Sequence, residues 1–211
     1  MTRIQKTVFI LVALIALVVG LTVSKVLNGE RQLDPTQLLD AGIVLLPQSR
    51  PLPALSLTDE NGQAVQVDQL KGGWTLLFFG YTFCPDICPT TLAELRQLNG
   101  LLPEAVRGQI QPILVSVDPN RDTPAKLKEY LGYFKAGFHG WTGTPEAIQT
   151  LANGVGIPFI PPDTSKENYT VDHSGNLVII GPDGRQHGFI RAPLRVQKLA
   201  EQLPALVQQQ R

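Results

Sequence analysis

Apolar residues fall along this chain in patterns that predict an alternation of strands and helices. Two continuous apolar runs, at residues 74–81 and 111–117, are typical of strands that are buried on both faces of a sheet. Between them, leucines recur at helical spacing through residues 90–102, which predicts a helix with one buried stripe. The first helix therefore connects two central strands.

Three further helices are predicted after the second run, at residues 124–134, 145–153 and 194–209. The first two begin with a proline, which suits the first turn of a helix. Each of these prolines follows a residue that can cap the helix, Thr144 in one case and either Asp122 or Thr123 in the other.

Two β-hairpins and one short strand complete the predicted elements. The first hairpin joins residues 54–58 to 64–67 around an Asn-Gly turn, and the second joins 177–180 to 188–190 around a Pro-Asp-Gly turn. The short strand is expected at residues 42–46. Together these elements predict an α/β fold, with a central mixed sheet flanked by helices.

The N-terminus has a different pattern. The 18 residues 7–24 carry no charge and are mostly Val, Leu, Ile and Ala. A helix of this length measures about 27 Å, close to the thickness of a bilayer's hydrocarbon core. Arg3 and Lys6 precede it, so we expect residues 1–6 to stay in the cytoplasm and the rest of the chain to be exported. We interpret residues 7–24 as an uncleaved transmembrane anchor, with a cleaved signal peptide as the alternative.

The anchor sets the expected domain organisation. Residues 25–50 contain Asn-Gly and Asp-Pro breaks and little periodicity, so we predict a linker there and one globular domain over residues 51–211. No segment that resembles a mitochondrial transit peptide precedes the anchor. We therefore expect a single-pass protein of a bacterial inner membrane, with its C-terminal domain in the periplasm.

Charge and composition exclude one class of partner. Lys+Arg and Asp+Glu both number 18, so the formal net charge is +0 and no basic surface for nucleic acid is expected. Apolar residues make up 43% of the chain, which is ordinary for a globular domain and argues against disorder.

Cys84 and Cys88 directly follow the first apolar run and open the first helix, which is the layout of a thioredoxin-type site. Such a site lies at the carboxyl end of its strand. In an exported domain the pair can form a structural disulfide. A bridge between residues four apart closes a very short loop, however, and would stabilise the fold little. We therefore favour a working dithiol, which exchanges disulfides or binds a metal.

The residues around the cysteines are compatible with a soft-metal site or with a redox dithiol. Pro89 suits the first helical position, which makes Cys88 the capping residue. A thiol at the positive end of a helix dipole is expected to have a lowered pKa and to reach the thiolate form that binds metal. Two thiolates suit copper(I) or zinc. Zinc usually takes four protein ligands in a structural site, whereas copper(I) accepts fewer.

The chain has three histidines that can supply a further ligand. His139 and His187 lie in a predicted loop and a predicted hairpin turn, and both are expected to be exposed. His173 lies just before the predicted strand 177–180. A histidine in a loop is usually solvent-exposed, so its position alone leaves ligation by His173 open.

Three segments of the chain carry a resemblance to a known family. They are Gly80-Tyr81-Thr82-Phe83-Cys84-Pro85-Asp86-Ile87-Cys88-Pro89, Ser116-Val117-Asp118-Pro119-Asn120-Arg121-Asp122-Thr123-Pro124, and Val171-Asp172-His173-Ser174 followed by Pro182-Asp183-Gly184. Their content and order resemble the SCO/SenC family of copper-binding proteins, which help to assemble cytochrome c oxidase. The resemblance covers roughly residues 75–185.

The resemblance implies a thioredoxin-like fold on a membrane anchor. It also implies that Cys84, Cys88 and His173 bind one copper ion, as Cu(I), as Cu(II) or as both in turn. Asp118 matches an acid that the family carries near the site. We expect it either to orient the ligands or, as an ordinary turn residue, to cap the helix that follows.

The implied function is that of a copper chaperone rather than an enzyme. Such a protein receives copper from an upstream donor and passes it to the copper-site subunit of cytochrome c oxidase. The alternative is a thiol–disulfide oxidoreductase, in which Cys84 and Cys88 form a redox-active pair that reduces the copper-ligand cysteines of the oxidase. A peroxidase on the same fold is a third candidate.

Overall fold

The structure is a computed structural model that describes residues 3–27, 33–165 and 169–208. The chain divides into two units, Met1–Gln32 and Leu33–Arg211. In the first unit, helix α1 spans Arg3–Leu27, and its Arg3–Thr22 window has a mean hydropathy of 2.4. The helix is long and apolar enough to cross a membrane, as predicted for residues 7–24.

Within the described residues, the second unit is built on one eight-stranded sheet, in the order β1-β8-β7-β4-β5-β6-β2-β3. The strands are β1 Ile43–Pro51, β2 Ser56–Asp59, β3 Ala64–Gln66, β4 Trp74–Gly80, β5 Ile110–Ser116, β6 His139–Thr142, β7 Leu177–Ile180 and β8 Arg185–Ile190. β4, β5 and β6 run parallel, and the other neighbours are antiparallel. This arrangement confirms the predicted mixed sheet.

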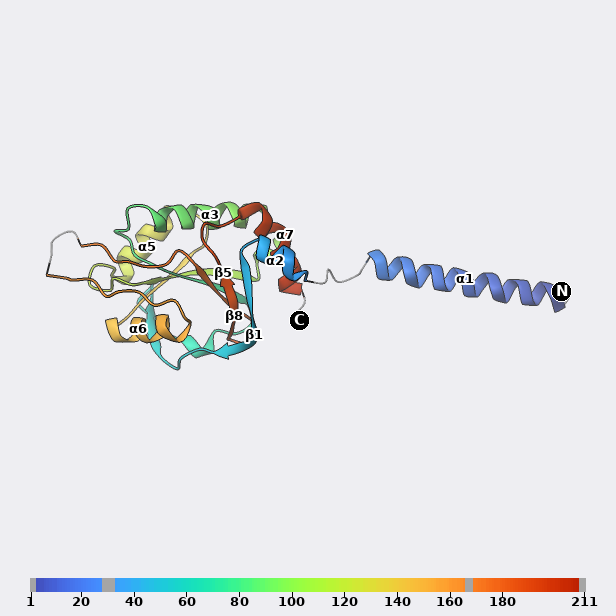
Figure 1. The fold of residues 1–211 in the computed structure, drawn as a ribbon, viewed down its shortest axis with the longest axis horizontal. Coiled ribbons are helices and arrows are strands. Elements are labelled where there is room, and N and C mark those ends of the chain that lie inside the picture. Colours follow the sequence, from blue (N-terminus) through green and yellow to red (C-terminus); the bar gives the residue numbers. More distant parts are fainter. Residues whose placement is uncertain (1–2, 28–32, 166–168, 209–211) are drawn as a thin grey trace. The chain divides into compact units, whose positions relative to one another are not determined.

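Helices cover both faces of the sheet. They are α2 Pro35–Asp40, α3 Ile87–Leu101, α4 Glu104–Arg107, α5 Pro124–Gly132, α6 Pro145–Gly154 and α7 Val196–Gln208, with a 3₁₀ turn, η1, at Val67–Gln69. α3 and α7 pack together on one face, and α6 lies on the other (Figure 1). The predicted α/β class is therefore confirmed.

Threonines cap the two helices that begin with proline. Thr144 Oγ1 accepts a hydrogen bond from the Ala147 amide at 3.2 Å, and Thr123 Oγ1 accepts one from the Lys126 amide at 3.3 Å. Both contacts satisfy an amide that has no partner inside its own helix. Of the two caps considered for α5, Thr123 is the one used, and Asp122 is left for another role.

β4 is the central element of the sheet and positions the loops that follow it. All of its residues are buried, as expected for a strand paired on both edges. It pairs with β5 in parallel and with β7 in antiparallel register, in which Phe78 lies opposite Leu177. Since β7 runs in the opposite direction, the residues that precede it lie beside those that follow β4.

The structure differs from the sequence prediction in several places, and the short elements η1 and α4 were not predicted. Residues 33–51, assigned mostly to a linker, form α2 and the edge strand β1, and the compact unit begins at Leu33. His139 was expected in a loop but opens β6, a strand of four residues. The first helix begins at Ile87, three residues before the predicted start at residue 90. Each difference involves short or Pro-containing segments, in which local periodicity is weak.

Leu77→Ala tests the central position of β4. Leu77 is 0% exposed, so its truncation leaves a cavity between packed layers and should lower the free energy of unfolding by about 2–5 kcal/mol. The matched control is Leu101→Ala, because Leu101 is 50% exposed on α3 and its loss should change stability by less than about 0.5 kcal/mol. Urea unfolding of the two variants measures both values, and equal destabilisation would contradict this account of the core.

Candidate metal site

The candidate ligands come from three positions around the carboxyl end of β4. Cys84 lies in the loop that follows this strand, and Cys88 lies in the first turn of α3. His173 lies in the segment that leads into β7. The antiparallel pairing of β4 with β7 thus brings a histidine from late in the chain to the cysteine loop.

The three donor atoms lie close enough together to hold one ion. The Sγ atoms of Cys84 and Cys88 and a ring nitrogen of His173 all lie within 4.8 Å of one another. Cys88 Sγ and His173 Nε2 are 3.0 Å apart. Both cysteines are free thiols. The residues that the resemblance singled out as copper ligands therefore meet in space.

Backbone amides orient the two sulfurs. Cys88 Sγ accepts a hydrogen bond from the Tyr81 amide, and Cys84 Sγ accepts one from the Cys88 amide, both at 3.4 Å. Cys88 is fully buried, whereas Cys84 is 9% exposed. Cys84 is therefore the sulfur that an incoming molecule reaches first.

The hydrogen bonds of His173 leave one ring nitrogen free for a ligand role. Its Nδ1 lies 3.1 Å from the Val171 carbonyl oxygen, which can only accept, so Nδ1 carries the proton. Nε2 then has the lone pair, and it is the nitrogen that faces Cys88 Sγ. Burial also lowers the pKa of His173. The ring is therefore neutral near pH 7, as metal ligation requires.

The expected pKa of Cys88 was wrong. α3 begins at Ile87 with Asp86 at the N-cap, so Cys88 lies inside the helix and is not its cap. Burial raises the pKa of the Cys88 thiol, and this effect outweighs the hydrogen bond from the Tyr81 amide, which lowers it. In the metal-free protein Cys88 therefore keeps its proton, and a metal ion must displace that proton on binding.

A buried carboxylate anchors the cysteine loop to the sheet. Asp122 accepts hydrogen bonds from the Thr82 amide at 3.0 Å and from the Thr82 hydroxyl at 2.6 Å. Ser116, the last residue of β5, donates to the same carboxylate at 2.7 Å. Burial raises the pKa of Asp122, and these hydrogen bonds favour its charged form. Sequence reasoning considered Asp122 only as a helix cap and missed this contact.

Asp118 makes no direct contact with the three donors and does not cap α5. Its buried carboxylate accepts hydrogen bonds from Arg121 Nε and, at 2.7 Å, from the Tyr169 hydroxyl. Tyr169 lies four residues before His173. Asp118 therefore reaches the candidate site indirectly, through Tyr169 in the segment that carries His173 and through Arg121, which packs on Phe83 of the cysteine loop.

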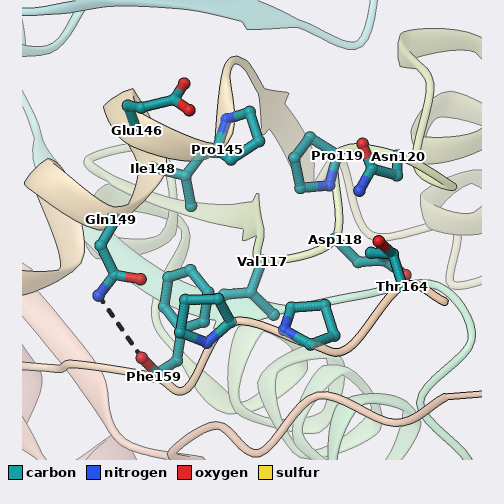
Figure 2. Close-up of a pocket in the computed structure, with 12 residues that line it drawn as sticks. Val117, Asp118, Pro119, Asn120, Pro145, Glu146, Ile148, Gln149, Phe159 and Thr164 are labelled. Atoms are coloured by element: carbon teal, nitrogen blue, oxygen red, sulfur yellow. Dashed lines mark hydrogen bonds between the residues drawn. The ribbon is translucent and has the colours of Figure 1, made fainter.

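A cavity of about 360 Å³ lies on the other side of Asp118. Figure 2 shows its walls, which come from Val117–Asn120, from the start of α6 and from the segment at residues 159–164. Most of this lining is apolar, and none of the three donor residues belongs to it. The cavity is therefore separate from the candidate metal site.

The other two histidines lie apart from this cluster. His139 Nδ1 is 3.0 Å from Glu60, and His187 Nε2 is 2.9 Å from Asp183. The His187 side chain is largely buried and packs edge-on against Trp74, so the expectation that it is exposed was wrong. Among the described residues, Cys84, Cys88 and His173 form the one group of three or more His, Cys, Asp or Glu side chains placed to hold a metal.

Comparison with known proteins points to one family. The SCO1/SenC family model matches residues 48–208 of this chain. A Stutzerimonas stutzeri protein, provisionally named copper-binding, is 49% identical over 180 residues that cover 85% of this chain and 88% of that protein. Mitochondrial SCO2 of Saccharomyces cerevisiae is 38% identical over 72% of this chain, which spans 52% of the yeast protein.

A solved structure shows the same fold. Arabidopsis thaliana ScoI, determined with copper bound, is 30% identical to this chain with a TM-score of 0.65. The match covers 75% of this chain and 99% of the Arabidopsis structure. The thioredoxin-like arrangement that the cysteine motif predicted is therefore confirmed.

Gly80→Ala tests the packing around the buried sulfur. A Cβ atom at residue 80 would lie 2.6 Å from Cys88 Sγ, so the sulfur must move and copper(I) affinity should fall by about 10-fold or more. The control is Gly143→Ala, whose Cβ would lie 2.6 Å from the end of Leu57 and so strains the fold without touching a donor. A competition titration with a copper(I) chelator compares the two variants. If Gly80→Ala folds and binds as tightly as the native chain, the described position of Cys88 is wrong.

Proposed function

The chain belongs to the SCO1/SenC family, and on this premise we propose that it is a membrane-anchored copper chaperone. It binds one copper ion through Cys84, Cys88 and His173 and transfers the ion as cargo. The observation that carries the proposal is the convergence of these three donor atoms within 4.8 Å.

The chemistry of the donor set fits copper(I). Two thiolates and one imidazole are soft to borderline ligands, and copper(I) is stable with three of them. Structural zinc usually takes four protein ligands, whereas this cluster supplies three. An open three-ligand site can also pass its ion to a partner by ligand exchange, because an incoming ligand can bind before the first one leaves. Cys84, the more exposed sulfur, is the position at which that exchange begins.

The proposed partners follow from the role of the family. An upstream donor supplies copper to the reduced dithiol, and the copper-site subunit of cytochrome c oxidase receives it. The two cysteines must be reduced to bind, so the thiol–disulfide state controls loading.

The proposed location is a bacterial inner membrane, with the copper site in the periplasm. α1 serves as the anchor, and its apolar window supports this assignment by length and composition. Arg3 and Lys6 at its start favour a cytoplasmic N-terminus.

A thiol–disulfide oxidoreductase is the second candidate, because the two free thiols are adjacent in space. In this reaction one cysteine attacks the disulfide of a target protein and forms a mixed disulfide, and the other cysteine then attacks that bond and releases the target's second thiol. The target leaves with two thiols, and this chain is left with a Cys84–Cys88 disulfide. His173 has no required part in this exchange.

His173→Ala separates the two functions. Loss of one donor out of three should weaken copper(I) binding by at least about 10-fold, as measured by anaerobic titration of the reduced domain against a competing chelator. The control is His139→Ala, because His139 pairs with Glu60 away from the cluster and its loss should leave the affinity unchanged.

The opposite result favours the reductase. If the native domain binds copper(I) weakly, or if His173→Ala binds as tightly as the native domain, the site is mainly a dithiol. Full oxidase assembly in cells that carry His173→Ala would point in the same direction.

A further inference from the structure

We propose that Arg121 is a positioning residue that fastens the His173 segment to the cysteine loop. The side chain contacts residues on both sides of the site and none of the three donors. Loss of its planar guanidinium would then leave a dithiol that the imidazole assists only weakly. This inference rests on the copper site proposed above, although its structural part can be tested without metal.

On the histidine side, Arg121 holds Tyr169 in two ways. Its guanidinium carbon lies 3.7 Å from the centre of the Tyr169 ring, which is a stacking contact. Its Nη2 donates to the Tyr169 carbonyl oxygen at 3.0 Å. The Tyr169 hydroxyl and Arg121 Nε both donate to Asp118, which fixes the pair against the loop after β5. The ring, the backbone carbonyl and the hydroxyl of Tyr169 are therefore each held by Arg121 or Asp118.

On the cysteine side, Arg121 contacts the residue next to Cys84. The guanidinium carbon lies 4.8 Å from the centre of the Phe83 ring, and 5.7 Å from that of Tyr81. Phe83 is 53% exposed, and Lys126 also lies over its ring, with Nζ 5.1 Å from the ring centre. One planar cation thus lies between an aromatic residue of the cysteine loop and one of the histidine segment.

The hold on Tyr169 extends to His173 through Val171. The Val171 amide donates to the Tyr81 hydroxyl at 3.2 Å, and the Val171 carbonyl accepts from His173 Nδ1 at 3.1 Å. Arg121 therefore holds Tyr169, the Tyr81 hydroxyl holds the Val171 backbone, and the Val171 carbonyl orients the His173 ring. In the described part of this segment, the Ile160 amide also donates a hydrogen bond to the Asp172 carbonyl oxygen at 3.4 Å. Without Arg121, the imidazole keeps these hydrogen bonds and its ring contacts with Tyr81 and Phe78, at 5.4 and 6.3 Å between ring centroids, but the start of its segment loses its contact with the cysteine loop.

A purely electrostatic role for Arg121 gives a different expectation. Asp118 is 0% exposed, so removal of the positive charge would leave a buried carboxylate without its ion pair and destabilise the fold. Arg121→Lys separates the two roles. Lysine keeps the charge beside Asp118, but it lacks the flat group that stacks on Tyr169 and the second nitrogen that reaches the Tyr169 carbonyl.

The test is a double-mutant cycle on copper(I) affinity. Arg121→Lys should weaken binding by roughly 10-fold when His173 is present. In the His173→Ala background the same change should alter affinity by less than about twofold, because the residue acts through His173. The matched control is Lys126→Ala. Lys126 also lies over the Phe83 ring, at 5.1 Å, and has no described contact with the histidine segment, so its loss should leave affinity unchanged.

A second readout uses the metal-free domain. Arg121→Lys should speed hydrogen exchange of the Val171 amide several-fold, and Lys126→Ala should leave it at the native rate. An equal loss of affinity with and without His173, or native exchange at Val171 in Arg121→Lys, would overturn the proposal. A third outcome is that the native domain fails to bind copper(I) while Arg121→Lys still speeds exchange at the Val171 amide. That result would contradict the copper function and support the positioning role of Arg121 alone.

Discussion

The site depends on one packing constraint, the approach of Cys88 Sγ and His173 Nε2 to 3.0 Å across 85 positions of sequence. The sheet produces this approach. Because β7 runs antiparallel beside β4, the segment before β7 reaches the same edge as the loop after β4. Gly80 leaves room there for the sulfur, since any larger residue would occupy its position. The functional groups thus meet because the central strands are paired in this register and Gly80 has no side chain at the end of β4.

This packing also determines the chemistry of the metal-free site. Burial raises the pKa of Cys88 and lowers that of His173, so both groups favour their neutral forms without metal. A bound cation reverses this preference at the sulfur, because it stabilises the thiolate that burial disfavours. The neutral imidazole of His173 can bind the same ion through the lone pair on Nε2. These neutral forms are compatible with the proposed copper site, whose affinity should depend on how firmly the surrounding loops hold the donors.

Sequence patterns predicted the central elements well, because each is set by neighbouring residues. The buried run of β4, the span of β7 and the caps Thr123 and Thr144 are all local features. The short strand β6 has too few residues to show a period. The prediction of a lowered pKa for Cys88 was wrong because burial, which raises the pKa, depends on tertiary packing that the motif does not reveal. His173 could be selected only by resemblance, and Arg121 was missed because its partner Tyr169 lies 48 residues away.

The most direct test of the central claim is X-ray absorption at the copper edge of the reduced domain, loaded anaerobically with one equivalent of copper(I). The account predicts a three-coordinate ion with two sulfur neighbours and one imidazole nitrogen, supplied by Cys84, Cys88 and His173. A shell of sulfur alone, or one with more sulfur than a single chain can supply, would contradict it. Copper would then be held by the dithiol without His173, or between two chains.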